Sequence, residues 1–419
     1  MFRSKSQSIV LSYCANIHPA EDLETTLAYL KTHTVPIQQH FFSESRLGLG
    51  LWISSHFAQE LLNSPEKREQ LQDFTREQNL FHFTFNGFPY GSFHGQRVKE
   101  KVFHPSWLEP ERLFFLKDLS FLLSQFLPKN ASKGSISTLS GTFKPEHHST
   151  DILQKIARQQ LEMVPFLKEL EEKTGKQIAI ALEPEPFNTL ETTEEVITYF
   201  HDYLFPCAKE TYGPLFGKKT EETVTRYLGI CYDTCHQACQ FEDLPESLLR
   251  LKNAGIPIHK VQLSNALHLP SPKHNPAGIE KLKTFQEPVY LHQLIGKRQN
   301  HRDRVRDLSD FFETIYPKNP EYWNQMEAWR VHFHVPLFYR GSDELQTTQK
   351  DLNLAIQTLL SEELTQHFEI ETYTWDVIPI EERQKLRKTL TDGLIREFEY
   401  VLEQFSKNQV LCIKTERIQ

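Results

Sequence analysis

Acidic and imidazole side chains stand at the ends of three short apolar segments of this chain. The residues that share this position are Glu183, Asp233, His236 and Glu371. Carboxylates confined in one pocket repel one another unless protons or a cation neutralise them. These four residues therefore predict a divalent-metal site. Glu183 and Glu371 are also the predicted catalytic residues, because a carboxylate beside a metal can move a proton.

Two further segments offer metal ligands. Gln262 lies in the apolar run 258–267, and His332 and His334 point the same way if the run 329–338 is extended. Three carboxylates, imidazoles and an amide oxygen suit Mn²⁺, Zn²⁺ or Mg²⁺, and the histidines favour Mn²⁺ or Zn²⁺ over Mg²⁺. Spacing alone leaves open whether His332 and His334 are ligands or a structural pair.

Other residues near these segments are interpreted as structural. Glu185 and Glu369 are expected to be ion-pair partners rather than ligands. Cys231, Cys235 and Cys239 have a C-x₃-C-x₃-C spacing that is not a standard zinc or iron–sulfur pattern, so we expect their thiols not to converge.

A polar loop at 86–107 follows another apolar run and supplies the predicted substrate-binding residues. These are Asn86, His94, Arg97 and Lys99. Loops after strands often carry function, and the basic side chains could hold an anionic group. His94 could also reach a metal. A solvated basic loop is the alternative.

Eight apolar runs, separated by longer helical patterns, must position these residues. The runs are 9–17, 47–54, 80–87, 134–141, 178–186, 228–236, 258–267 and 368–375, and helical patterns cover 108–127, 151–175 and 382–405. This alternation predicts a parallel sheet, and eight repeats predict a (β/α)₈ TIM barrel. An open doubly wound sheet is the alternative, but Gly48-Leu49-Gly50 lacks the third glycine of a nucleotide-binding loop.

We expect one domain, residues 1–419, with rim insertions near 88–107 and 268–340. The segment 329–338 is the additional element, interpreted as an extra strand or rim loop between the seventh and eighth strands. It follows a stretch, 268–328, that looks irregular.

Composition excludes several classes of protein. The 419 residues carry a net charge of −8, which argues against binding to nucleic acid or an anionic membrane surface. No apolar stretch approaches 18 residues, six cysteines do not form a disulfide framework, and the N-terminal run is interpreted as a strand rather than a signal peptide. We expect a cytoplasmic protein with no membrane insertion.

The motifs resemble those of the xylose-isomerase-like TIM-barrel superfamily, which includes sugar isomerases, sugar epimerases and endonuclease IV. Asp233-Thr-Cys-His236 is similar to its Asp-x-x-His element, and Glu183 and Glu371 resemble its two metal-binding glutamates. His332-Phe-His334 resembles the Asp-x-His element of endonuclease IV, and His94 resembles an early histidine ligand of that enzyme. Gln262 stands where the epimerases have histidine, and Ser140 where endonuclease IV has histidine.

More closely, the chain resembles the metabolite-traffic protein EboE family. The matching stretches are 11–19, 47–54, 85–95, 98–107, ALEPEP, CYDTCH and VHFHVPL. That family belongs to gene clusters implicated in moving or preparing secondary metabolites, so partners from the same cluster are expected.

The resemblance implies a metal-dependent isomerase or epimerase that acts on a small polyhydroxylated or hydroxy-ketone metabolite. His236, with His332 and His334, would form a second metal site or orient the ligands of the first. A non-catalytic metabolite carrier and a metal-assisted phosphoesterase are the alternatives.

Overall fold

Eight parallel strands form a closed barrel. The computed structural model describes residues 2–3, 7–92, 94, 99–144 and 149–412. Adjacent strands pair in the order β2-β14-β8-β7-β6-β5-β4-β3, and a parallel bridge from Cys14 to Gly50 brings β2 beside β3. The strands are β2 (Ser8–Tyr13), β3 (Leu47–Trp52), β4 (Leu80–Asn86), β5 (Lys133–Leu139), β6 (Gln177–Glu183), β7 (Leu228–Asp233), β8 (Ile258–Leu263) and β14 (His367–Ile370). Each overlaps one of the eight predicted runs, so the predicted (β/α)₈ barrel is confirmed.

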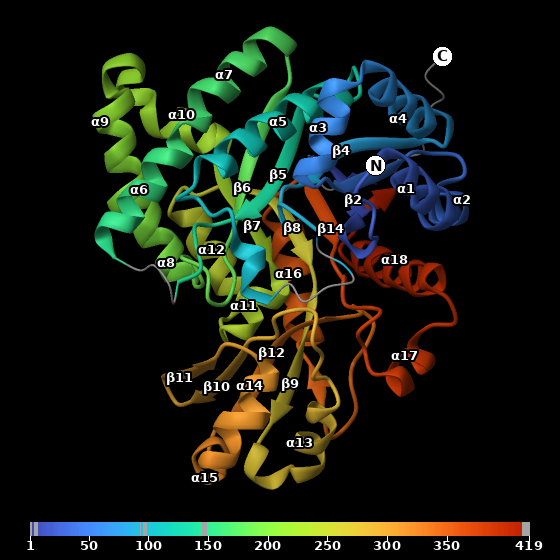
Figure 1. Ribbon diagram of the computed structural model, residues 1–419, viewed down its shortest axis with the longest axis vertical. Helices are drawn as coiled ribbons and strands as arrows, with labels where there is room; N and C mark the ends of the chain where they lie inside the picture. Colours follow the sequence, from blue (N-terminus) through green and yellow to red (C-terminus); the bar gives the residue numbers. More distant parts are fainter. Residues whose placement is uncertain (1, 4–6, 93, 95–98, 145–148, 413–419) are drawn as a thin grey trace.

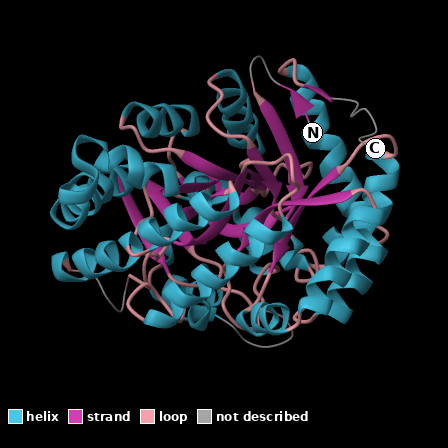
Figure 2. Cartoon of the chain, turned by 90° about the horizontal axis from the view of Figure 1, so that it is seen from above, coloured by secondary structure: helices cyan, strands magenta, loops and turns pink. Residues whose placement is uncertain are grey.

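Helices surround the strands, which lie in the centre of the molecule when it is seen from above (Figure 2). Before β7 they are α1 (Leu23–Tyr29), α2 (Val35–Phe42), α3 (Ser55–Asn63), α4 (Pro65–Glu77), α5 (Pro110–Phe126), α6 (Thr150–Leu161), α7 (Met163–Thr174), α8 (Thr193–Thr198), α9 (Phe205–Phe216) and α10 (Thr220–Tyr227). After it come α11 (Thr234–Cys239), α12 (Leu244–Asn253), α16 (Gln349–Ser361), α17 (Ile380–Leu386) and α18 (Leu390–Lys407). None of the described helices is both long and apolar enough to cross a bilayer.

Two of the predicted helical patterns are each divided. The pattern 151–175 becomes α6 and α7 because Pro165 has no N–H to continue the helix, although Gly175 ends α7 in the left-handed conformation as predicted (φ 69°). The pattern 382–405 becomes α17 and α18, since Thr389 and Asp392 form a capping box that starts a new helix.

A second sheet is inserted between β8 and β14 and lies at the lower end of the barrel in Figure 1. Its antiparallel strands pair in the order β11-β10-β12-β9-β13. They are β9 (Asn265–Pro270), β10 (Leu294–Arg298), β11 (His301–Val305), β12 (Ala328–Val335) and β13 (Gln346–Thr347), with α13 (Pro276–Lys283), α14 (Leu308–Asp310) and α15 (Pro320–Asn324) between them.

This inserted sheet corrects two expectations. The stretch 268–328 is not irregular, because β10 and β11 form a hairpin that pairs with β12. The run 258–267 is not a single strand: β8 ends at Leu263, and β9 begins at Asn265 and pairs with β12 of the inserted sheet. The segment 329–338 is an extra strand, as predicted, and it is the middle strand of the insertion.

The centre of the barrel contains an ion pair where barrels usually hold layers of branched apolar side chains. Lys260 Nζ lies 2.6 Å from Glu369 Oε2, and both side chains are fully buried. Lys260 also donates to Asn86 Oδ1 (2.9 Å), and Ser12 donates to Glu369 Oε1 (3.2 Å). The structural interpretation of Glu369 is therefore confirmed.

Gly50 leaves the space that this ion pair occupies. A Cβ atom added at Gly50 would lie 1.5 Å from Glu369 Oε1 and 2.9 Å from Ser12 Oγ. Glycine at this position therefore serves the packing of the barrel interior.

Replacing Gly50 with alanine is predicted to lower the free energy of unfolding by about 2–4 kcal/mol, because the methyl group would push the Glu369 carboxylate away from Lys260. Urea unfolding followed by circular dichroism measures the change. Gly91→Ala is the control: a Cβ there meets no atom of the described residues within 4 Å, and we expect a change below about 0.5 kcal/mol. Equal stability of Gly50→Ala and the wild type would contradict this account.

Candidate metal centre

The carboxyl ends of four neighbouring strands bring the predicted carboxylates together. Glu183 ends β6, Asp233 ends β7 and Glu371 follows β14. One carboxylate oxygen from each lies within 4.8 Å of the other two, and all three side chains are buried. Gln262, on the intervening strand β8, lines the same pocket. These four predicted residues therefore meet in one place.

Asp233 is held by the start of α11. Its Oδ1 caps the helix by accepting from the backbone N–H groups of Cys235 (2.7 Å) and His236 (3.0 Å), and it also accepts from Ser264 Oγ (2.6 Å). Its Oδ2 is buried and receives no hydrogen bond from the described part of the chain. The helix start thus fixes one oxygen and leaves the other available to a cation.

Two amides hold Glu371. Its Oε1 accepts from Asn16 Nδ2 (2.9 Å) and from Gln262 Nε2 (3.0 Å). The carbonyl oxygens of the same amides, Asn16 Oδ1 and Gln262 Oε1, are buried and have no hydrogen-bond donor within the described ranges. Leaving a buried acceptor without a hydrogen bond costs free energy. Together with Asp233 Oδ2, these are three acceptor atoms that a cation or a donor group of a ligand could satisfy.

The carboxyl groups of Glu183 and Glu371 have pKa values well above their usual range. Burial is the main cause for both, and the neighbouring carboxylates add to it: Asp233 beside Glu183, and Glu183 beside Glu371. The Lys260 charge in the barrel centre acts in the opposite direction on the pKa of Glu183. Without a cation, the pocket therefore retains protons.

Three imidazoles meet beside the carboxylates. The Nε2 atom of His332 lies 2.9 Å from that of His334 and 3.0 Å from that of His236, and the third side of this triangle is 3.4 Å. His236 belongs to α11, whereas the other two project from β12 of the inserted sheet. The structure thus brings the two predicted histidines of β12 together with His236.

The outer nitrogens of these rings fix which nitrogen carries the proton. His236 Nδ1 donates to the Pro184 carbonyl (3.1 Å), His334 Nδ1 to the Glu371 carbonyl (2.9 Å) and His332 Nδ1 to Gln293 Oε1 (2.6 Å). Burial lowers the pKa of each imidazole, so the rings are neutral and their Nε2 lone pairs point into one small space.

This donor set fits a divalent cation. Neutral imidazoles that carry Nδ1–H and present Nε2 are a common form of metal ligand, and the acceptors at Nδ1 hold the rings in place. In a tetrahedral zinc site with Zn–N distances of about 2.0–2.1 Å, ligand nitrogens are about 3.3 Å apart, which is close to the observed triangle. Asp233 joins the two groups, because it lies within 4.8 Å of both the other carboxylates and the pair His236 and His334.

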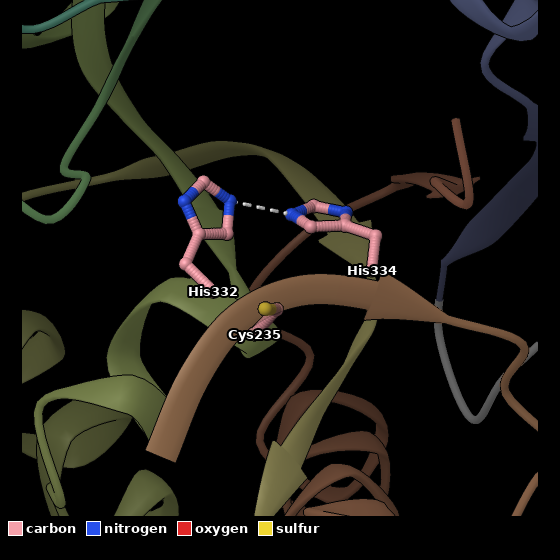
Figure 3. Close-up of side chains that lie close together, drawn as sticks. All are labelled: Cys235, His332 and His334. Carbon is pink, nitrogen blue, oxygen red and sulfur yellow. Dashed lines mark hydrogen bonds between the residues drawn. The ribbon is translucent and has the colours of Figure 1, made fainter. Parts of the chain in front are cut away.

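Glu185 and Cys235 lie closer to the imidazoles than expected. Glu185 shares a ligand-sized space with His236 and His332, and Cys235 shares one with His332 and His334. Figure 3 shows the rings of His332 and His334 facing each other with the Cys235 sulfur nearby. The interpretation of these two residues as structural stays a prediction, since Glu185 Oε1 also lies 3.9 Å from His332 Nδ1 as an ion-pair partner would. The expectation that the thiols do not converge is wrong for Cys235 and Cys239, which share a side-chain hydrogen bond because they lie four residues apart on α11.

The predicted substrate-binding loop has mixed outcomes. Asn86 lines the pocket, and Arg97 lies outside the described residues. Lys99 lines the pocket but its Nζ is 2.5 Å from Asp307 Oδ2, so its charge is already balanced. His94 does not reach the carboxylates, because its Nε2 donates to the Asn16 carbonyl (2.6 Å) and its Nδ1 accepts from Tyr290 (3.1 Å).

Sequence reasoning missed Asn16 and undervalued Glu185. Both carried the signal used for the other residues, since each is a polar side chain just beyond the end of a barrel strand. Tyr373, two residues after Glu371, and Tyr290, which precedes β10 of the inserted sheet, also line the pocket.

The pocket has a polar floor and largely apolar walls. Its volume is about 60 Å³, and one water needs at least about 10–15 Å³ on this measure, so a few water-sized groups fit. The floor contains the carboxylates, imidazoles and amides described above, and the walls include Phe88, Pro89, Val102, Leu139, Tyr290, Leu291 and Tyr373.

Comparisons with known proteins identify similar structures only. No protein-family model matches the sequence, and no curated protein matches it. Similar solved structures include an L-ribulose 3-epimerase (8% identity, 96% of both chains covered, TM-score 0.49), a xylose isomerase domain protein from Planctomyces limnophilus (11%, 96% of this chain and 97% of that one, 0.48) and a xylose isomerase-like TIM barrel protein from Mycobacterium smegmatis in complex with magnesium (9%, 96% and 97%, 0.47). At these identities and scores no functional residue is transferred to this chain.

The metal-free protein is predicted to lose stability between about pH 6.5 and pH 8. Burial, with Asp233 nearby, raises the pKa of Glu185 to about 8. The folded protein then retains a proton that the unfolded chain has released, so each such carboxyl lowers the free energy of unfolding by up to about 1.4 kcal/mol per pH unit.

The three imidazoles make the free energy of unfolding rise with pH rather than fall, but only at lower pH. Their folded pKa values are lowered, so the stability they contribute is lost as pH falls below about 6.5. Urea unfolding at several pH values in the presence of a chelator measures the slope, and Glu185→Gln should flatten it. A slope of zero or of opposite sign above pH 6.5 would refute the assignment.

Proposed function

We propose that this chain is a metal-dependent isomerase or epimerase that acts on a small polyhydroxylated or hydroxy-ketone metabolite. One observation carries the proposal: the buried carboxylates of Glu183, Asp233 and Glu371 share one pocket, and neighbouring acceptors there receive no hydrogen bond from any described residue. Such a group is stable when a cation balances its charge, and a cation beside proton-accepting carboxylates is an arrangement that can move a proton next to a carbonyl.

The metal is proposed to be held by Glu183, Asp233, Gln262 and Glu371. All present oxygen atoms, which suits Mn²⁺ or Mg²⁺, whereas the imidazoles of His236, His332 and His334 suit Zn²⁺. When bound, such a cation polarises a carbonyl and its neighbouring hydroxyl.

Glu183 or Glu371 is proposed to take a proton from the substrate carbon and return it. Both groups hold protons readily in this pocket, as their raised pKa values indicate. Asn16 and Gln262 fix the orientation of Glu371 through its Oε1. Positioned acid–base groups of this kind contribute about 10²–10⁴ in rate.

A small molecule suits the pocket better than a polymer. The polar floor lies at the carboxyl ends of the strands, and the walls leave a volume of about 60 Å³ above it. Asn16 Oδ1 is placed to contact a hydroxyl group of such a ligand, and the net charge of −8 is unfavourable for nucleic acid.

Metal-assisted phosphoester hydrolysis is the second candidate. The observation that favours it is the imidazole triangle beside the carboxylates, with Asp233 belonging to both groups. The two groups could hold two adjacent cations, and such a pair can stabilise the attacking and leaving oxygens of a phosphoryl group. A carrier without catalysis would use the same pocket and need no metal. Membership of the EboE family, partners from a gene cluster and a cytoplasmic location stay predictions from the sequence.

Asp233→Asn is predicted to lower the affinity for Mn²⁺ or Zn²⁺ by at least about tenfold, because it removes one charge from both groups of ligands. Metal content by mass spectrometry and isothermal titration measure the change. Asp243→Asn is the matched control, since Asp243 caps α12 as Asp233 caps α11, and asparagine keeps both caps.

The number of metals separates the candidates. One ion per chain supports the isomerase, two adjacent zinc ions support the hydrolase, and no bound ion supports the carrier. Equal metal affinity in Asp233→Asn and Asp243→Asn would contradict the proposed centre.

The metal-loaded protein is predicted to exchange the hydrogen next to the carbonyl of a small ketose or hydroxy-ketone for deuterium in D₂O. Proton NMR of a substrate panel detects the loss of signal. Glu183→Gln and Glu371→Gln, assayed with metal bound, should each reduce the rate by at least about 10². Metal-loaded wild type that exchanges no panel compound would count against the isomerase, and release of phosphate from phosphoesters would favour the second candidate.

A further inference from the structure

Glu397 is a fully buried carboxylate in α18, outside the barrel and outside the pocket lining. Its Oε1 accepts from Thr372 Oγ1 (2.5 Å) and from the Leu337 backbone N–H (3.2 Å), and its Oε2 accepts from Trp375 Nε1 (3.0 Å). Its hydrogen bonds thus come from two segments that are far apart in the sequence.

Both segments leave the candidate metal centre. Thr372 and Trp375 follow Glu371, which belongs to the carboxylate group, and Leu337 follows His334, which belongs to the imidazole group. The segments also contact each other directly: Thr374 Oγ1 donates to the His334 carbonyl (2.5 Å), and His334 Nδ1 donates to the Glu371 carbonyl (2.9 Å). Glu397 accepts hydrogen bonds from both segments and so links them a second time, from α18.

Ionising a carboxyl group at this position is costly. Burial raises the pKa of Glu397 to about 7, because the charged form loses its hydration there. All three of its donors are neutral groups whose positions it defines. Its benefit therefore lies in fixing two segments relative to each other rather than in added stability.

We infer that Glu397 is a positioning residue that sets the placement of His334 relative to Glu371, and with it the spacing of the imidazole and carboxylate groups. Its role in metal binding rests on the proposed function, whereas its effect on the His334 ring does not. Replacing a residue that orients a metal ligand through a hydrogen bond typically lowers metal affinity by about 10–100-fold.

Glu397→Gln is the principal test variant. A glutamine keeps one acceptor oxygen, but its NH₂ group must face either Trp375 Nε1 or the donors from Thr372 and Leu337, so one contact is lost. Glu397→Leu removes all three contacts in a side chain of similar size, and it serves as a second variant should the first retain too much of the geometry.

The first measurement is the proton position on His334 in the metal-free protein at pH 8, where Glu397 is ionised. Nitrogen-15 NMR of labelled histidine should show the Nδ1–H form alone in the wild type. We expect a mixture of the two neutral forms in Glu397→Gln and in Glu397→Leu, because the Glu371 carbonyl is no longer held against the ring.

The second measurement is titration with Zn²⁺ and with Mn²⁺. We expect Glu397→Gln to bind at least about tenfold more weakly while its circular dichroism spectrum stays that of the folded wild type. Glu242→Gln is the matched control, because Glu242 is a partly buried carboxylate that accepts from Thr193 N (3.0 Å) and Oγ1 (2.7 Å). The control should leave both measurements unchanged.

The outcomes separate this inference from the proposed function. A wild type that binds no metal would refute the proposed metal centre, while the His334 measurement still decides the role of Glu397. Both Glu397 variants showing the wild-type proton position, with metal affinity within about threefold where metal binds, would overturn the inference.

Discussion

Mutual repulsion among three buried carboxylates is the constraint around which this structure is arranged. Glu183, Asp233 and Glu371 lie where bulk water cannot screen them, and the interaction between like charges is strong in such a place. The surroundings respond in three ways: a helix start binds one oxygen of Asp233, two amides bind one oxygen of Glu371, and Lys260 adds positive charge from below. What remains unbalanced is the charge that a divalent ion would supply.

The barrel and its carboxylates could be predicted because both follow from short-range rules. Parallel strands place their carboxyl ends on one rim, so Glu183, Asp233 and Glu371 had to meet once eight strands were assigned. Asn16 also follows the end of a barrel strand, but a neutral amide does not by itself indicate a metal site as a carboxylate does. The helix breaks at Pro165 and Thr389 were also readable, since each has a local cause.

The inserted sheet could not be predicted in the same way. Apart from the hairpin of β10 and β11, its strands pair with partners that are tens of residues away in the sequence. No local pattern shows that this hairpin lies beside β12. The roles of Lys99, His94 and Cys235 depend on that sheet and on the loops near it. Lys99 meets Asp307, which follows β11, and Cys235 meets histidines of β12. Their environments are therefore set by tertiary contacts rather than by neighbours in sequence.

The imidazole triangle has a mixed origin, with one ring from the eightfold repeat and two from the insertion. A chain with the same barrel and a plain turn from β8 to α16 would retain Glu183, Asp233 and Glu371 and lose two nitrogen donors. The insertion thus adds two nitrogen donors beside a group of oxygen donors. Changes confined to the insertion would alter this set of donors while the eight strands stay unchanged.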